Sequence, residues 1–232
     1  MLNQLFEQFD HIILLDIETT GLDPRKDEII EFGALRVGRK DIEIRGAAEV
    51  NLLIRLTAGK VLPAAITKLT GITSEMLEKN GVSKETAGGE IVKMLDVPKP
   101  LVVAYNAQFD LCFLYYFLKS LGAESVLRKA RFLDALTVYK DRRDYPHKLE
   151  NALETYALTA QNTHRAIDDA RAALELMYAM ASESDDLARY INLFGYNSRY
   201  GISGPRISSI RYVPQSSYAR AKKAYEETPT AG

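Results

Sequence analysis

The order of apolar and polar positions predicts a group of strands in the first quarter of the chain. Residues 11–18 (HIILLDIE) form a short apolar run that ends near Gly21 and Pro24, which is typical of a buried strand. Branched residues interrupted by glycines continue through residues 27–38 and 41–56. Together these segments predict a β-meander of about three strands.

The rest of the chain alternates once between strand and helix and then becomes helical. Helical patterns follow Pro63 and cover residues 74–80 (SEMLEKN) and 83–95, and residues 100–106 (PLVVAYN) return to a strand pattern. From Ala107 onward the pattern predicts an almost wholly helical chain, with helices over residues 108–122, 150–158 and 165–180. Strands followed by alternating strand and helix predict an α/β fold around a mixed β-sheet flanked by helices.

Composition and charge narrow the class of protein. At 232 residues, with 47% hydrophobic and 26% charged residues, the chain has the composition of an ordinary soluble domain. A net charge of −1 argues against binding nucleic acid by overall charge alone, although a local basic patch stays possible. The single cysteine, Cys112, excludes an intramolecular disulfide framework. No stretch approaches the roughly 20 apolar residues of a membrane span, and the first ten residues have no basic leader, so we expect a cytoplasmic protein without a membrane partner.

The composition changes near Asn197. The segment after it is rich in Ser, Gly, Pro and Tyr, and from Arg199 it contains six Lys or Arg residues against two Glu. We therefore expect a domain over residues 1–196 and a basic C-terminal extension over residues 197–232. The extension is either a weakly ordered tail or strapped onto the domain, or it is an arm that contacts nucleic acid or a partner through charge and stacking.

Two acids stand at the end of the first predicted strand. Asp16 and Glu18 are two residues apart, so their side chains point to the same face. Like charges on one face repel each other unless a cation lies between them, and hard carboxylate ligands suit Mg²⁺ or Mn²⁺. The alternative is an incidental pair of acids at a strand end.

Two later helices also carry acids that break their apolar pattern. Asp110 falls on the apolar face of its helix, although an acid in the first turn also suits the helix N-terminus. In residues 165–180, the helical phase puts Asp169 at the edge of the apolar face and Asp168 in solvent. His164 stands just ahead of this helix, five residues before Asp169, where a structural and a catalytic role are both open.

Three motifs, DIETTG (16–21), YNAQFD (105–110) and HRAIDDA (164–170), resemble those of the DEDDh family of 3′–5′ exonucleases. That family includes the proofreading exonucleases of bacterial DNA polymerase III and the ribonuclease T group. The resemblance runs from about His11 to Met180 and implies a ribonuclease H-like fold. It also implies that four acids hold metal, and that a histidine is the general base; the residues are Asp16, Glu18, Asp110, Asp169 and His164.

The chemistry that the resemblance implies is two-metal hydrolysis of a phosphodiester. Two divalent ions, Mg²⁺ or Mn²⁺, roughly 4 Å apart would activate water and stabilise the leaving 3′ oxygen, and His164 would accept the water's proton. We also expect the 3′-terminal nucleotide to contact the loop after the first acids and the start of the following helix; the residues are Thr19, Thr20, Gly21, Leu22, Asn106 and Phe109.

Parts of the chain depart from the family pattern. Tyr105 stands where many relatives have histidine, and residues 39–60 depart from a compact hairpin and suggest an insertion. The sequence therefore predicts a metal-dependent 3′–5′ exonuclease acting on nucleic acid 3′ ends, with single-stranded DNA favoured and a DNA polymerase as a possible partner. An RNA-trimming exoribonuclease and a non-catalytic polymerase accessory module are the alternatives.

Overall fold

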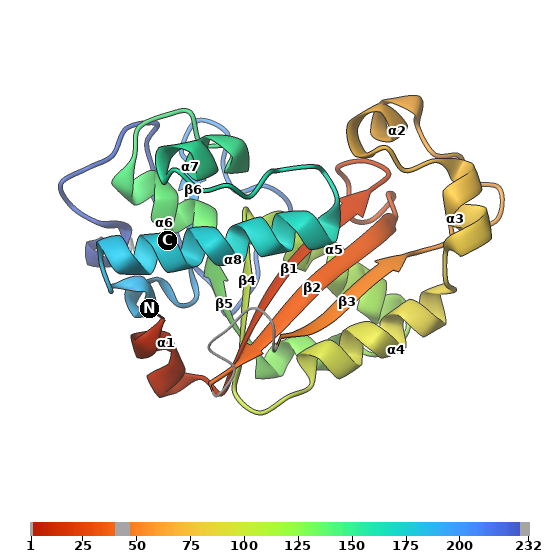
Figure 1. Ribbon diagram of the computed structural model, residues 1–232, viewed down its shortest axis with the longest axis horizontal. Helices are drawn as coiled ribbons and strands as arrows, with labels where there is room; N and C mark the ends of the chain where they lie inside the picture. The colour runs from red at the N-terminus through yellow and green to blue at the C-terminus, as the bar shows by residue number, and fades with distance from the viewer. Residues whose placement is uncertain (1, 40–46, 228–232) are drawn as a thin grey trace.

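The computed structural model describes residues 2–39 and 47–227, and its centre is a mixed sheet (Figure 1). Its five strands in the described residues lie in the order β3-β2-β1-β4-β5. Strands β1, β2 and β3 are antiparallel neighbours, whereas β4 pairs parallel with both β1 and β5. This arrangement confirms the predicted α/β fold with a mixed sheet. The strand bounds are His11–Thr19 (β1), Ile29–Gly38 (β2), Ala48–Leu53 (β3), Pro100–Ala104 (β4) and Arg131–Asp134 (β5).

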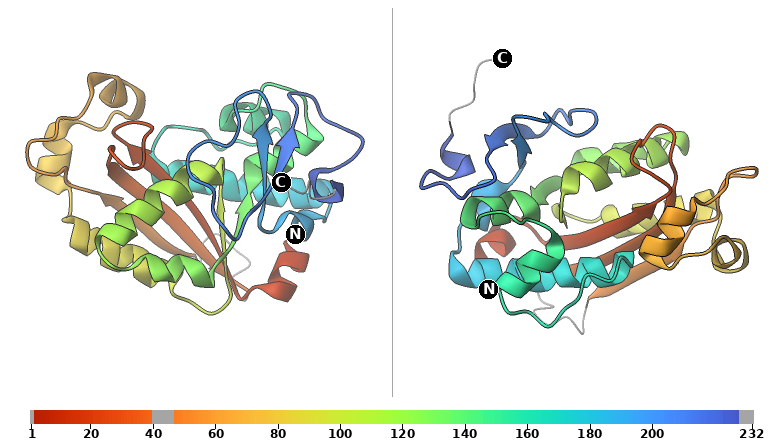
Figure 2. Two further views of the ribbon diagram at one scale, coloured as in Figure 1. Left: turned by 180° about the vertical axis from the view of Figure 1, so that it is seen from behind. Right: turned by 90° about the horizontal axis from the view of Figure 1, so that it is seen from above.

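Helices cover both faces of the sheet, as the two views in Figure 2 show. Helix α8 lies along one face against β1 and β2, and α4 and α5 lie on the other. The helices that carry or flank the site are α4 (Lys84–Leu95), α5 (Ala107–Ser120), α6 (Ala135–Arg142), α7 (Leu149–Thr155) and α8 (Ala166–Glu183). The remaining α-helices are α1 (Asn3–Gln8), α2 (Ala64–Thr70) and α3 (Ser74–Asn80). Three short 3-10 helices are η2 (Glu124–Lys129), η3 (Leu187–Tyr190) and η4 (Ala224–Glu226).

The alternation of side chains in β1 sets the direction of its two acids. Leu14 packs in the core on the α8 side, and Leu15 and Ile17 pack in the core on the α5 side. Because alternate residues share a face, Asp16 and Glu18 lie on the α8 side with Leu14. Both apolar faces of the strand are buried, which fixes this register.

The expectation of an almost wholly helical chain after Ala107 is wrong. Residues Arg131–Asp134 form β5, and two later segments, Leu193–Asn197 (β6) and Arg211–Gln215 (β7), pair in parallel as a separate two-stranded sheet. These strands are only four or five residues long, too short for periodicity to distinguish them from helix. The expected third strand of residues 41–56 is seen as β3 from Ala48 to Leu53, and residues 40–46, part of the suspected insertion over 39–60, lie outside the described residues.

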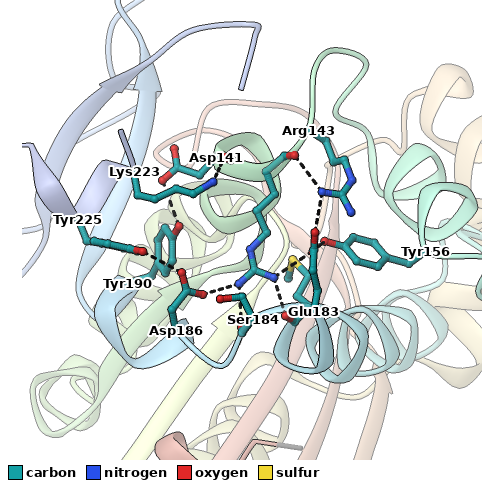
Figure 3. A network of polar contacts seen from close by, with 11 residues as sticks. Asp141, Arg143, Tyr156, Glu183, Ser184, Asp186, Tyr190, Lys223 and Tyr225 are labelled. Carbon is teal, nitrogen blue, oxygen red and sulfur yellow. Dashed lines mark hydrogen bonds and ion pairs between the residues drawn. The ribbon is translucent and has the colours of Figure 1, made fainter. Parts of the chain in front are cut away.

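The described part of the C-terminal extension packs on the domain. Its strand β7 pairs with β6, and its later residues join a polar network around α6 (Figure 3). The buried carboxylate of Asp141 accepts hydrogen bonds from the Gln215 amide at 2.7 Å and the Tyr190 hydroxyl at 3.2 Å. The Lys223 ammonium donates to the Asp141 carbonyl at 2.7 Å, and the Tyr225 hydroxyl donates to Asp186 at 2.9 Å. These contacts attach the described part of the extension, through residue 227, to α6 and to the segment after α8.

None of the helices in residues 2–39 and 47–227 is both long and apolar enough to cross a membrane.

Candidate active site

The first two acids come from the end of β1. Asp16 pairs in register with Gly33 of β2, and Glu18 pairs with Glu31. The register shifts after Glu18, between it and Thr19, so the strand becomes irregular directly beyond the acids. Asp16 and Glu18 are half-buried and point to the side on which α8 begins.

Asp110 comes from the first turn of α5, and its position depends on a second buried acid. Its side chain is 2% exposed, so its carboxylate faces inward as the helical phase predicts. The Asp134 carboxylate accepts hydrogen bonds from the amides of Asn106 at 2.9 Å and Ala107 at 3.1 Å, which fixes the start of α5. Asn106 itself has a left-handed backbone with φ of 70°, so this turn is sharply defined. Asp134 also caps α6 through the Leu136 amide at 3.2 Å.

The fourth acid comes from the first turn of α8, where the structure separates two neighbouring aspartates. Asp169 is 5% exposed and its carboxylate accepts the Thr163 amide at 3.0 Å. Asp168 lies at the surface and pairs with Arg171 at 3.0 Å. The helical phase therefore distinguished the inward acid correctly. His164 precedes the helix with a left-handed backbone, φ 54°, which turns the chain into α8.

The acids and the histidine converge at one place between β1 and the starts of α5 and α8. One carboxylate oxygen each of Glu18 and Asp169 and one ring nitrogen of His164 lie within 4.8 Å of one another. Within residues 2–39 and 47–227, Asp16 and Asp110 are not part of that close group. Asp110 is nonetheless near enough to raise the pKa of both Asp16 and Glu18 through its charge, and the charges of Asp169 and Glu18 raise the pKa of Asp16.

The electrostatics of the cluster are those of crowded, partly buried acids. Burial, followed by repulsion from Asp169, raises the pKa of Glu18 to about 8. Burial also raises the pKa of Asp169 to about 6, although the Thr163 amide opposes this. The pKa values of Asp16 and Asp110 are raised well above the usual range, chiefly by burial. All four acids are therefore held where negative charge is unfavourable without a cation.

This donor set fits divalent metal ions. Four carboxylates supply hard oxygen ligands of the kind that Mg²⁺ and Mn²⁺ prefer, and the imidazole of His164 lies beside them. Arg165 contributes positive charge here, but it lowers the pKa of Glu18 less than burial and the neighbouring acids raise it. A cation between the acids would thus relieve the repulsion that raises their pKa values.

An ion pair between a buried glutamate, which lies outside the three motifs, and a partly exposed arginine fixes the start of α8. Glu31 is fully buried on β2, opposite Glu18, and contacts the Arg165 guanidinium at 2.6 and 3.0 Å. Glu31 also accepts the amide of Ala166 at 3.0 Å. Glu31 therefore fixes Arg165, which stands between His164 and the first turn of α8 in the chain. A charged residue inside the apolar run IIEFGAL was the signal for it.

A glycine lets α8 approach the sheet beside Asp16. A Cβ atom on Gly33 would lie 2.2 Å from the backbone nitrogen of Ile167, far inside normal contact. Since Gly33 is the register partner of Asp16, this close approach brings the first turn of α8 over the end of β1. The role of Gly33 could not be predicted from the sequence, because a lone glycine in a strand has several structural uses.

The loop after the acids has its own fixed geometry. The Thr19 hydroxyl donates to the Gly21 carbonyl at 2.6 Å, and the Thr20 hydroxyl accepts the Glu28 amide at 2.9 Å. Leu22 is 84% exposed at the tip. An exposed leucine on an ordered loop is available to pack against a ligand.

The other two predicted substrate contacts flank the start of α5. Asn106 is exposed, and Phe109 is half-buried with its ring 4.8 Å from that of Phe113. The Tyr105 hydroxyl donates to the His147 carbonyl at 2.8 Å, which agrees with a structural role at that position. Asn106 and Leu22 are thus both exposed, Asn106 directly before α5 and Leu22 in the loop after β1, the two elements that carry Asp110 and the first two acids.

Comparison with known proteins identifies relatives of this fold and site. Residues 13–177 match the family model RNase_T, described as an exonuclease. The PolC-type DNA polymerase III of Caldanaerobacter subterraneus is 33% identical over 75% of this chain, and the chain spans 12% of that polymerase. The DNA polymerase III subunit epsilon of Treponema pallidum is 31% identical over 76% of this chain and 80% of its own length.

The solved structures support the same fold. Exonuclease I of E. coli, in its complex with a dT13 oligonucleotide, superposes with a TM-score of 0.67 at 19% identity over 78% of this chain and 43% of its own. This likeness confirms the ribonuclease H-like arrangement predicted from the motifs. The family match covers residues 13–177, well over half of the chain, and includes all three motifs. The chain therefore belongs to the RNase_T exonuclease family.

Proposed function

We propose that this domain is a metal-dependent 3′–5′ exonuclease that releases nucleoside 5′-monophosphates from the 3′ end of nucleic acid, with single-stranded DNA favoured. The observation that carries the proposal is the group of four acids of raised pKa at the end of β1 and the starts of α5 and α8, in which Glu18 and Asp169 lie within 4.8 Å of His164. A domain that only bound nucleic acid would gain nothing from burying these charges. The 3′–5′ exonuclease DinG of Bacillus subtilis, 34% identical over 68% of this chain and 16% of its own length, supports the direction.

In this proposal the four acids hold two Mg²⁺ or Mn²⁺ ions. Asp16, Glu18, Asp110 and Asp169 are the ligands, because each combines a hard oxygen donor with a site that disfavours unbalanced negative charge. When bound, the metals would supply positive charge to the phosphate and make water a better nucleophile.

His164 is the general base of the proposal. One of its ring nitrogens accepts a proton from the attacking water. The turn before α8 holds the backbone of His164, and the Glu31–Arg165 pair fixes the next residue. The rigid start of α8 therefore keeps the ring beside Glu18 and Asp169.

The proposed position of the 3′-terminal nucleotide is between the 19–22 loop and the start of α5. Backbone groups of Thr19, Thr20 and Gly21 contact the sugar and its 3′ hydroxyl, and the exposed Leu22 packs on the base. Asn106 and Phe109 contact the same nucleotide from the side of α5. Support comes from the exposure of Leu22 and Asn106 at the rim of the acid cluster.

We also propose that this domain works with a DNA polymerase. The Treponema pallidum relative is an epsilon subunit of DNA polymerase III, and the PolC-type relatives are polymerases. By analogy, this domain would remove nucleotides from a primer end that a polymerase presents.

The test of direction and product uses single-stranded oligonucleotides labelled at either end. With Mg²⁺, we expect the 5′-labelled strand to shorten stepwise and the 3′-labelled strand to release one labelled nucleoside 5′-monophosphate. Matched DNA, RNA and duplex substrates rank the preference. Release of 3′-phosphates, internal cleavage, or shortening from the 5′ end would contradict the proposal.

A further inference from the structure

We propose that residues 198–210, the arm of the C-terminal extension, form one wall of a groove that binds the single-stranded segment adjoining the 3′-terminal nucleotide. The inference rests on the proposed function and extends it from the terminal nucleotide to the strand behind it. The arm connects β6 to β7 and lies beside the start of α5.

The arm is fixed to the start of α5 by one side chain. The Gln108 amide nitrogen donates to the carbonyls of Ser203 at 2.9 Å and Pro205 at 2.7 Å. Its amide oxygen accepts the Tyr212 hydroxyl at 2.7 Å. Gln108 lies in the turn of α5 that begins at Asn106 and contains Asp110, so these hydrogen bonds set the arm at a defined place relative to the proposed nucleotide site.

The groove beside the arm has the lining expected for a nucleic acid strand. It encloses about 130 Å³, and its lining includes Asn106, Lys140, Tyr196 and Tyr212. None of its lining residues is acidic. Aromatic rings can stack on bases, and a lysine can pair with a phosphate, without reading sequence.

The arm adds two further cations without bringing an acid. Arg199 and Arg206 are both exposed, and residues 198–210 contain no Asp or Glu. Arg199 lies over the ring of Tyr200 at 5.5 Å and Arg206 over the ring of Tyr212 at 5.2 Å. Within the described residues neither guanidinium makes an ion pair with a carboxylate. Both charges are available to phosphate groups.

The arm also reaches the other predicted contact of the terminal nucleotide. Gly204 and Pro205 line a second hollow of about 330 Å³ together with Leu22 and the residues that follow it. The same short segment therefore adjoins Asn106 on one side and Leu22 on the other. A strand whose 3′ nucleotide lies between those residues must pass close to the arm as it leaves the site.

This placement explains how a chain of net charge −1 can bind a polyanion. Lys140 lines the groove, and Arg199 and Arg206 are exposed on the arm that borders it. Binding beyond the terminal nucleotide then depends on the cations of the extension and not on the net charge of the chain.

The test compares a long and a minimal substrate in the full chain. The double substitution Arg199→Ala/Arg206→Ala should raise KM for a single-stranded oligonucleotide about tenfold, and the logarithmic dependence of binding on salt should flatten by about 1.4. Hydrolysis of the p-nitrophenyl ester of thymidine 5′-monophosphate, which fills only the terminal site, should be unchanged. The matched control is Lys79→Ala/Arg128→Ala, which removes two exposed cations on α3 and η2, away from the arm.

Fluorescence anisotropy of labelled DNA and RNA oligonucleotides in chelator measures the same effect without catalysis. The arm variant should bind both more weakly than the control variant does. Equal binding by the two variants, or an equal loss of activity on both substrates, would overturn the inference. If the unmodified chain hydrolyses neither substrate, the proposed function fails, and the anisotropy result still decides the role of the arm.

Discussion

At the scale of single residues, the acids of the site are the groups whose charge the folded domain tolerates least. Glu18 has a pKa of about 8 and Asp169 of about 6, each raised first by burial. Their unfolded pKa values are near 4, so the folded protein binds more protons than the unfolded chain between these limits. These groups therefore lower the stability of the metal-free fold as the pH rises from about 4 toward 8.

We predict that the melting temperature in excess chelator falls as the pH is raised from 6 to 8.5. Added Mn²⁺ should raise the melting temperature more at pH 8 than at pH 6, because bound cations favour the ionised acids. Glu18→Gln should melt higher than the unmodified chain at pH 8 in chelator and gain less from Mn²⁺. Differential scanning calorimetry measures each value. A melting temperature that rises with pH over this range would contradict the pKa assignment.

At the scale of elements, α8 is tied to the sheet by two Arg–Glu pairs in very different surroundings. Arg165 binds Glu31, which is fully buried on β2. Arg171 binds Glu49 on β3, and both of those side chains are about 40% exposed. The first pair fixes the start of α8, where His164 and Asp169 lie, and the second lies further along the helix.

Removing the two glutamates one at a time should separate these roles. We predict that Glu31→Ala costs about 1.5–3 kcal/mol, because it leaves the Ala166 amide and the partly exposed Arg165 guanidinium without their charged partner. Glu49→Ala should cost about 1 kcal/mol or less. Urea unfolding monitored by circular dichroism measures both. Equal costs would mean that the buried pair does not fix the helix.

The elements also show how far the sequence could be used to predict this fold. The strand ending in Asp16 and Glu18 followed from its short apolar run and the turn residues after it, and the phase of α8 followed from periodicity, because a long helix repeats its pattern over several turns. The strand β5 did not, since its four residues RFLD carry too little pattern.

The site was predictable to the extent that its residues break a local rule. Asp16, Glu18, Asp110 and Asp169 each put a charge into an apolar pattern, and so did Glu31, which was not recognised. Gly33 and Gln108 could not be found in this way. Their roles depend on a close approach of α8 and on the path of the extension, and both are properties of tertiary packing.

At the scale of the whole molecule, separate segments supply the parts of one proposed reaction centre. The end of β1 and the starts of α5 and α8 carry the acids, and the extension returns from the far side of the domain to border them. The Asp141 network fixes the end of that extension to α6. The match to the exonuclease family covers residues 13–177, so residues 198–227 lie outside it.

The central claim is that the buried acids, and not merely acids of these motifs, form a metal-dependent hydrolytic centre. The most direct measurement is the rate of 3′-nucleotide release from single-stranded DNA by Asp169→Asn and Asp168→Asn, two neighbouring substitutions of identical chemistry. We predict that Asp169→Asn lowers kcat about a hundredfold or more, since a metal ligand contributes several kcal/mol. Asp168→Asn should retain activity within about twofold, and excess chelator should abolish the activity of both. Equal activity of the two variants, or hydrolysis that persists in chelator, would contradict the account.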